Sequence, residues 1–261
     1  ARALEVGVTI RYSTTFADLE DDGEKVRVNY TDGTSDVADI VVGADGSRSV
    51  VRRYVLDEEL QLRYIGQSAY RVNIPRLPEI DRIILQEGPE GMAGLVPIGQ
   101  DLAYLFYNAH MDRPGRATND ELVAALRAHL APFGGITGRV RDEFINDDSS
   151  VVLRPEESLI SPAPWHKGRI VLIGDAVHAV TPHLGQGAAQ AIEDGVVLAE
   201  CIGKHDDLEA AFDEYTERRY ERCKLIVETS LAIGEWEMGR LPDFDNVAAT
   251  IHVLEVMAQP L

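Results

Sequence analysis

The sequence predicts an α/β protein that carries an inserted antiparallel β-sheet and ends in helices. Two apolar runs, residues 40–42 and 169–173, have the length of buried strands, and each is followed by glycine and aspartate. Between them, short segments of alternating polarity are separated by Pro and Gly, and beyond residue 187 the apolar spacing is helical. We therefore assign residues 1–57 and 151–206 to an α/β domain, residues 58–150 to a sheet domain and residues 207–261 to a helical segment.

Composition and charge narrow the classes of partner. The 261 residues are 45% hydrophobic, which is enough for a sizeable core. The 25 Lys and Arg are outnumbered by 44 Asp and Glu, and the net charge of −19 argues against nucleic acid and anionic membranes as partners. No apolar run is long enough to span a bilayer, and no signal-peptide pattern is visible, so we expect a cytoplasmic protein. Cys201 and Cys223 fit no disulfide pattern and are expected to be buried thiols.

The elements of the first domain follow from local patterns. Val26, Val28 and Tyr30 alternate with polar residues and predict a strand, which an Asp32-Gly33 turn ends. The next strand, at residues 40–42, is wholly apolar, and the later one, at residues 169–173, is apolar after Arg169. Both are expected to be buried on both faces.

One helix is expected to interrupt the inserted sheet. It begins after Thr118, with Glu121 at the spacing of a capping box, and carries Leu122, Leu126 and Leu130 along one face. A second helix, starting near residue 187, is expected to pack against the α/β sheet with a face of small and apolar residues: Ala188, Ala191, Ile192, Gly195, Ala199 and Ile202.

Two acids stand where open α/β sheets bind ligands. Asp45 and Asp175, each beside a glycine (Gly46 and Gly174), come just after the two buried strands. Each carboxylate could accept hydrogen bonds from sugar or polyol hydroxyls, or could cap the following turn through backbone N–H groups.

The segment after Asp175 favours a ligand. Pro182 discourages helix before it, and Gly185 and Gly187 let the main chain approach a flat or anionic group. The helix then starts with N–H groups that would stabilise negative charge. The string Gly185-Gln-Gly187 is not a GxGxxG fingerprint, so it does not by itself identify a nucleotide site.

Two longer stretches resemble a known family. "IVVGADGSRSVVRR" is similar to the Asp-Gly motif, and "GRIVLIGDAVHAVTPHLGQGAAQAIEDGVVLAE" to the Gly-Asp motif, of the single-component FAD-dependent aromatic hydroxylases, the family of para-hydroxybenzoate and salicylate hydroxylases. The resemblance covers nearly the whole chain. It implies a Rossmann-like FAD-binding domain with an inserted substrate-binding sheet.

The resemblance also implies roles for matching residues. Asp175 would bind the ribitol and pyrophosphate region of FAD, and Pro182 would lie near the reactive edge of the flavin. Asp45 and Gly46, with Ser49 and Arg52, would support the flavin and the passage of NADPH or NADH, although Ser49 and Arg52 are equally well read as scaffold. The main chain at the start of the helix would face the pyrimidine end of the flavin: Gly185, Gln186, Gly187, Ala188 and Ala189.

The chain departs from the family pattern in two places. Ala189 stands where many relatives have Asn, which removes an amide side chain but keeps the backbone N–H. The strand, GxGxxG and helix that bind the ADP half of FAD in the family have no counterpart in the sequence. The expectation is therefore a fragment of a larger flavoprotein or a chain that pairs with a separate one; a shortened, non-catalytic module is the alternative.

The reaction implied by the resemblance is hydroxylation of an aromatic or heteroaromatic small molecule. NAD(P)H would reduce FAD, dioxygen would give a flavin hydroperoxide, and the protein would position the ring in a mainly apolar pocket. Fold and FAD motifs leave a halogenase or a reductase open. No metal-ligand spacing is present, so no metal site is expected. Candidate substrate residues are Tyr70, Arg71, Tyr104, Phe106 and His183, with Tyr107, His110 and His178 also considered.

Overall fold

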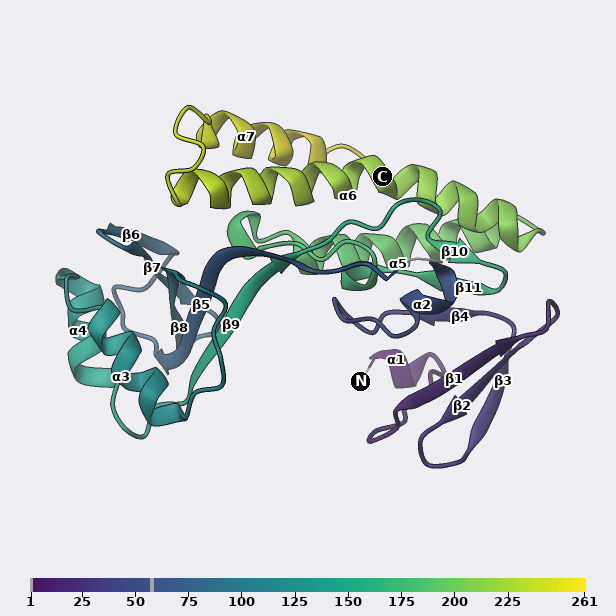
Figure 1. Ribbon diagram of the computed structural model, residues 1–261, viewed down its shortest axis with the longest axis horizontal. Coiled ribbons are helices and arrows are strands. Elements are labelled where there is room, and N and C mark those ends of the chain that lie inside the picture. Colours follow the sequence, from purple (N-terminus) through teal and green to yellow (C-terminus); the bar gives the residue numbers. More distant parts are fainter. Residues whose placement is uncertain (1, 57–58) are drawn as a thin grey trace.

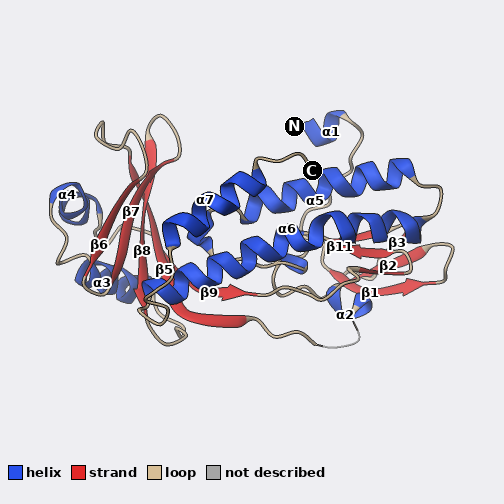
Figure 2. Cartoon of the chain, turned by 90° about the horizontal axis from the view of Figure 1, so that it is seen from above, coloured by secondary structure: helices blue, strands red, loops and turns tan. Residues whose placement is uncertain are grey.

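A computed structural model describes residues 2–56 and 59–261, and its elements form two bodies joined by long strands and a long helix (Figure 1). A five-stranded sheet with two helices on one face lies at one end. Two small sheets lie at the other end, beside helix α5 (Gly187–Lys204). Helix α6 (Leu208–Glu237) runs along both bodies, and α7 (Asn246–Met257) lies against it (Figure 2).

The α/β body holds the two predicted buried strands. β4 (Val41–Gly43) and β11 (Ile170–Leu172) pair in parallel, and β10 (His166–Lys167) continues the sheet in the order β10-β11-β4. β11 is buried throughout, as expected, but β4 lies at the edge and its Val42 is 39% exposed. The expectation that β4 is buried on both faces is therefore wrong for the described chain.

A separate antiparallel sheet precedes β4. It consists of β1 (Phe16–Asp21), β2 (Val26–Tyr30) and β3 (Ser35–Ala38), and the short helices α1 (Arg2–Glu5) and α2 (Arg52–Val55) flank this region. The predicted strand is β2, and Gly33 adopts the left-handed conformation, φ 85°, in the turn that follows it. Alternation and turn chemistry were sufficient signals here.

The five-stranded sheet is antiparallel, as predicted. Its order is β6-β7-β8-β5-β9, and its strands are β5 (Arg63–Pro75), β6 (Ile84–Gly88), β7 (Gly91–Pro97), β8 (Leu102–His110) and β9 (Val151–Ser158). β9 pairs with β5 from Val72 back to Arg63, so residues 151–158, which we assigned to the α/β domain, lie in this sheet.

Two helices cover one face of this sheet. α3 (Asn119–His129) starts with the predicted capping box, in which Thr118 and Glu121 exchange side-chain and backbone hydrogen bonds. α4 (Gly135–Phe144) was not predicted, because it starts at a Gly-Gly pair without a side-chain cap. A core of buried side chains fills the space between these helices and the sheet.

The second core lies in the α/β body. Residues of β11, α2, α5 and α6 surround the buried indole of Trp165. Cys201 and Cys223 are buried free thiols in α5 and α6, as expected. Within the described residues, no helix is long and apolar enough to cross a membrane.

Candidate functional site

The carboxyl ends of β4 and β11 lie side by side. The parallel register pairs Val41 with Ile170 and Gly43 with Leu172, so the two Gly-Asp loops leave the same edge of the sheet. Arg52 fixes them to each other: its guanidinium donates to the carbonyl of Ser47 (3.1 Å) in one loop and to that of Ala176 (2.9 Å) in the other. Arg52 is 7% exposed, and its guanidinium holds the two loops together.

Asp45 closes its own loop. Its carboxylate accepts from the backbone N–H groups of Val50 (2.7 Å) and Val51 (3.1 Å) and from the hydroxyl of Ser49. Gly46 has φ 84°, which only glycine adopts without strain. The capping alternative for Asp45 therefore describes what its carboxylate does in this structure.

Asp175 is placed differently. It lies in a short 3₁₀ turn, η1 (Gly174–Ala176), at the end of β11, and its side chain is exposed. Among the described residues none donates a hydrogen bond to its carboxylate. Gly174 has φ 59°, and a Cβ there would lie 3.1 Å from that of Ala191, so the loop passes close to α5. An acid free to accept hydrogen bonds thus stands beside the start of a helix.

The start of α5 is open. The 3₁₀ turn η2 (Pro182–Leu184) ends at Gly185 with φ 63°, and Gln186 caps the helix without a side-chain hydrogen bond. The N–H groups of residues 187–189 precede the first intrahelical bond, which Gln190 donates to Gln186. A Cβ at Gly187 would lie 3.0 Å from a methyl of Val180, so this approach needs glycine. These free donors form an anion-binding end.

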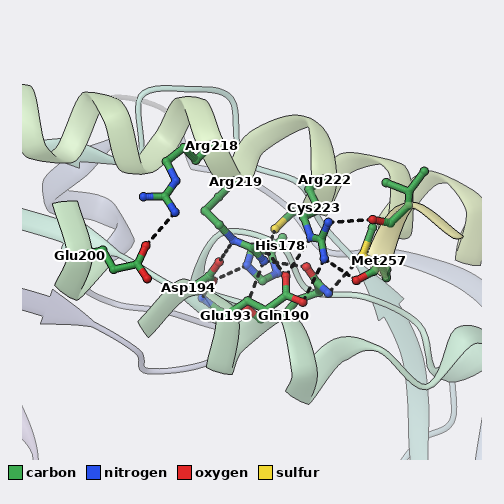
Figure 3. Close-up of polar contacts among 12 residues, drawn as sticks. His178, Gln190, Glu193, Asp194, Glu200, Arg218, Arg219, Arg222, Cys223 and Met257 are labelled. Atoms are coloured by element: carbon green, nitrogen blue, oxygen red, sulfur yellow. Dashed lines mark hydrogen bonds and ion pairs between the residues drawn. The ribbon is translucent and has the colours of Figure 1, made fainter. Parts of the chain in front are cut away.

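A buried ionic network holds this region from behind (Figure 3). Asp194 of α5 accepts from the backbone N–H of Gly174 (2.7 Å), bonds His178 Nε2 (2.6 Å) and accepts from Arg219 Nε of α6 (2.8 Å). Burial lowers the pKa of His178, but its hydrogen bond to Asp194 and its contact with Cys223 outweigh this and raise the pKa to about 10. Burial also raises the pKa of Asp194, and its bonds to His178 and Arg219 bring it below the ordinary value.

The network extends through Arg219 and Arg222. Arg219 donates to Gln190 Oε1 (2.6 Å) and Glu193 (2.6 Å), while Arg222 bonds Glu193 and the carbonyls of residues 256 and 257 at the end of α7 (Figure 3). Our prediction of which face of α5 is buried is wrong, since Ile192, which we placed on that face, is 69% exposed. The buried face contains Gln190 and Asp194, because arginines on α6 satisfy them.

Three ligand types come together in this network. His178, Asp194 and Cys223 offer atoms within 4.8 Å of one another. Arg219 donates to both Asp194 and Cys223, so a fixed guanidinium already supplies the positive charge that these groups attract. His178 is thus part of the scaffold behind the loop.

A cavity of about 740 Å³ lies between the five-stranded sheet and helices α6 and α7. Its apolar wall includes Leu85, Met92, Ile233 and Trp236. Its ionisable lining residues are Glu87, His110, His183 and Glu237. No Lys or Arg is among the described residues that line it.

His183 connects η2 to the cavity wall. Its Nε2 lies 3.1 Å from Gln67 Oε1 of β5, 3.4 Å from Glu237 Oε2 of α6 and 3.6 Å from Glu156 Oε2 of β9, while Nδ1 bonds Thr181. Burial lowers the pKa of His183, but the two carboxylates raise it above its ordinary value. The two carboxylates therefore favour the protonated form of this imidazole.

Glu156 is the member of this group whose carboxyl group makes no hydrogen bond in the described chain, although both of its oxygens are buried. Burial, with the nearby charge of Glu237, raises its pKa to about 7, against the opposing charges of His183 and Arg71. Glu156 therefore holds a proton near neutral pH.

Comparison with known proteins identifies the family. Residues 1–230 match the family model described as "FAD binding domain". The chain belongs to this family. It is 34% identical over 233 residues to 2-heptyl-3-hydroxy-4(1H)-quinolone synthase of Pseudomonas aeruginosa, covering 87% of this chain and 60% of the relative. It is 35% identical over 216 residues to aurachin C monooxygenase/isomerase of Stigmatella aurantiaca, covering 80% and 55%.

Solved structures share the fold of this FAD-binding chain. HpxO of Klebsiella pneumoniae, in complex with FAD and uric acid, aligns over 95% of this chain and 67% of its own with a TM-score of 0.82 at 23% identity. PqsL of P. aeruginosa, in complex with 2-aminobenzoylacetate, aligns over 93% and 66% with a TM-score of 0.73 at 26% identity. The chain spans 55–63% of the length of curated relatives that it matches.

The exposed groups at the strand ends fit FAD. Asp175 can accept from polyol hydroxyls, and the free N–H groups of α5 can face a ring system that becomes negative on reduction. Pro182 is exposed at the start of η2, beside both features. A Cβ at Gly174 or Gly187 would press on Ala191 or Val180, so these glycines let the loop and the helix start pack closely behind the open N–H groups.

The predicted substrate residues divide between the two faces of the sheet. Tyr70 is buried against the ring of His129 in the core under α3, and Tyr107 stacks on the same imidazole, so neither lines the cavity. Arg71 pairs with Phe106 in the register of β5 and β8, on the face that carries His110.

Phe106 and Tyr104 lie on that same face but not among the described residues that line the cavity. The ring of Phe106 lies over Gly94, where a Cβ would come within 2.1 Å of it. His183 and His110 are the candidates that do line the cavity.

Sequence reasoning missed Gln67, Glu156 and Glu237. Gln67 and Glu156 lie in strands whose alternation is broken by Gly66 and Pro155, and Glu237 is the last residue of a long charged helix. Nothing local separates them from surface residues. Only the fold brings the two strands and the end of the helix to His183.

Proposed function

We propose that this chain is the part of an FAD-dependent monooxygenase that positions an aromatic or heteroaromatic ring against the flavin. The observation that carries this proposal is that one turn, η2, serves both sites. Its exposed Pro182 and the open start of α5 border the cofactor cradle, and its His183 is part of the cavity wall. FAD, reduced by NAD(P)H, supplies the oxygen-transfer chemistry when bound.

The residues of the cradle bind and orient the cofactor. Asp175 accepts from the polyol chain, and the N–H groups of residues 187–189 stabilise negative charge at the ring. Asp194 and Arg52 hold the two loops from the protein side, so the cradle is fixed before ligand binding.

The cavity holds the substrate ring and excludes water. A volume of about 740 Å³ is in the range of small-molecule sites, and Leu85, Met92 and Trp236 offer apolar surface for a planar ring. Closing such a site protects reactive oxygen chemistry from solvent.

A second cavity, of about 310 Å³, is a candidate binding site for the reductant, NADPH or NADH. It adjoins Ser49 and Arg52, and Arg48, Arg53 and Arg113 line it. Glu157, which pairs with Arg48 and Arg113, and Glu59, which pairs with Arg53, also line it. Guanidinium groups recognise phosphates, so a phosphate of NADPH or NADH would bind here by replacing these ion pairs.

The names of relatives support the reaction class. The matched proteins include a quinolone synthase, a 6-hydroxynicotinate 3-monooxygenase and urate hydroxylases described as FAD-dependent. Their substrates, as named, include nitrogen-containing rings.

The test uses the purified protein with FAD. Binding should produce a flavin absorption spectrum that remains after gel filtration. NAD(P)H oxidation should then rise with an accepted aromatic compound, and oxygen from labelled dioxygen should appear in the product. A protein that stays colourless with excess FAD, or one that never incorporates oxygen across a panel of aromatic rings, contradicts the proposal.

A further inference from the structure

The acid of the cavity wall is held with one oxygen free. Glu237 Oε2 accepts from Gln67 Nε2 (2.9 Å) and lies 3.4 Å from His183 Nε2. In the described chain no residue donates to Oε1, and the side chain is 15% exposed on the cavity. Burial raises the pKa of Glu237, but His183 and Gln67 bring it below its ordinary value, so the carboxylate is ionised. Oε1 is thus a fixed, charged acceptor.

A second carboxylate adds to the negative charge of the cavity. Glu87 lines it from β6, whereas Glu156 lies behind His183 with its pKa raised to about 7. His183 lies between the carboxylates of Glu156 and Glu237, and its ring nitrogens already bond Gln67 and Thr181. Glu237 and Glu156 act on each other, and His183 acts on both. Arg71 also acts on Glu156, which in turn acts on Tyr64, and His110 acts on Glu237.

Arg71 does not change this balance. It is exposed on β5 and is not among the described residues that line the cavity, although its charge acts on Glu156. This placement does not support recognition of a substrate carboxylate in the cavity by Arg71.

We propose that Glu237 is the specificity-determining residue of the cavity and that the substrate is a planar ring donating N–H or O–H hydrogen bonds to it, neutral or cationic, and not an aromatic carboxylate. The inference rests on the proposed function for the cavity's role. An N–H or O–H group of the ring would donate a charge-assisted hydrogen bond to Oε1 of Glu237. A ring carboxylate would instead face Glu237 and Glu87, and no Lys or Arg among the described lining residues could pair with it.

Benzamidine and benzoate test the inference, because they are planar rings of one shape with opposite charge. Each is titrated into the purified protein by calorimetry at pH 7, and Trp236 fluorescence reports whether the probe reaches the cavity. We expect benzamidine to bind about 100-fold more tightly than benzoate, since contact between partly buried charges has an effect of this order.

Two variants of Glu237 test whether this residue causes the preference for benzamidine over benzoate. Glu237→Gln should reduce the ratio below about 10-fold, whereas Glu237→Asp should keep most of it. Glu235→Gln is the matched control: this residue lies on the same helix but pairs at the surface with Arg63 (2.8 Å), so the ratio should stay within about twofold. Glu87→Gln, on an exposed strand position, should lower the ratio several-fold even if Glu237→Gln does not fold.

Benzoate binding as tightly as benzamidine, binding of neither probe, or a ratio unchanged in both Glu237→Gln and Glu87→Gln would overturn the inference. These titrations use no reductant and no oxygen. Their failure is therefore distinct from failure of the monooxygenase proposal, which depends on flavin binding and labelled-oxygen incorporation.

Discussion

Replacing Asp194 by Asn should destabilise the protein more than any exposed acid would. The substitution keeps the shape of a fully buried side chain but removes its charge. Arg219, whose side chain is 0% exposed, then loses one of its two carboxylate partners and keeps only the partly exposed Glu193. Breaking a buried ion pair by removing one charge costs about 3–5 kcal/mol. The hydrogen bond that fixes the N–H of Gly174 is retained by the amide oxygen only if Asn does not turn toward Arg219.

The shift of His178 gives a second estimate of the same quantity. Its pKa is about 10 in the folded protein against 6.5 for an ordinary histidine, which corresponds to about 4 kcal/mol at pH 7. Because the folded pKa is the higher one, this stabilisation is complete below pH 6.5 and disappears as pH rises through about 10. The deficit of Asp194→Asn should therefore shrink in alkaline solution.

Urea unfolding at pH 7 and pH 10 measures both effects. For a chain of this size, about 4 kcal/mol corresponds to a fall in Tm of about 10 °C. Glu200→Gln serves as the control, since Glu200 lies on the same helix in an exposed pair with Arg218 and should change stability by less than about 0.5 kcal/mol. A deficit below about 1 kcal/mol at pH 7, or one that is the same at pH 10, would refute the reasoning.

Three further substitutions test other parts of the site. Asp175→Asn should leave stability within about 0.5 kcal/mol, because the side chain is exposed, but should weaken FAD binding measured by fluorescence titration; equal affinity would contradict its role. Arg52→Met should cost about 2–3 kcal/mol in urea unfolding, because two loop carbonyls lose a buried charged donor, and no loss would show that the loops are held otherwise. Glu156→Gln should remove a pH dependence: the wild type loses about 3 kcal/mol relative to this variant as pH rises from about 4.5 to about 7, because the folded pKa of this acid is the higher one. Parallel stability curves across that range would argue against a buried, unpaired Glu156.

The sequence predicted an element well where neighbouring residues alone encode its start or end. The capping box of Thr118 and Glu121 marked the start of α3, and the Asp32-Gly33 turn marked the end of β2. α4 was missed because Gly134 and Gly135 carry no start signal that a sequence pattern can use. Its place is fixed by burial of Val140 under the sheet, a contact between distant segments.

The buried face of α5 could not be predicted from its local sequence pattern. Apolar spacing favoured Ile192 and the small residues as the buried face, but Gln190 and Asp194 are buried instead. Hydropathy rates these two as surface residues, since burying a carboxylate is costly unless it is paired. Arg219 and His178, 25 and 16 residues away, make that burial possible, and no pattern within α5 could indicate them.

Helix α6 joins the two sites mechanically. Near its middle Arg219 holds Asp194 and, through it, the loop at Gly174, while its last residue, Glu237, holds His183. At a rise of about 1.5 Å per residue, a continuous helix sets these contacts about 27 Å apart along its axis. A shift of α6 would thus move the cradle loop and the cavity wall together. Because η2 lies between them, the proposed cofactor cradle and the cavity wall are held by one helix rather than by two independent loops.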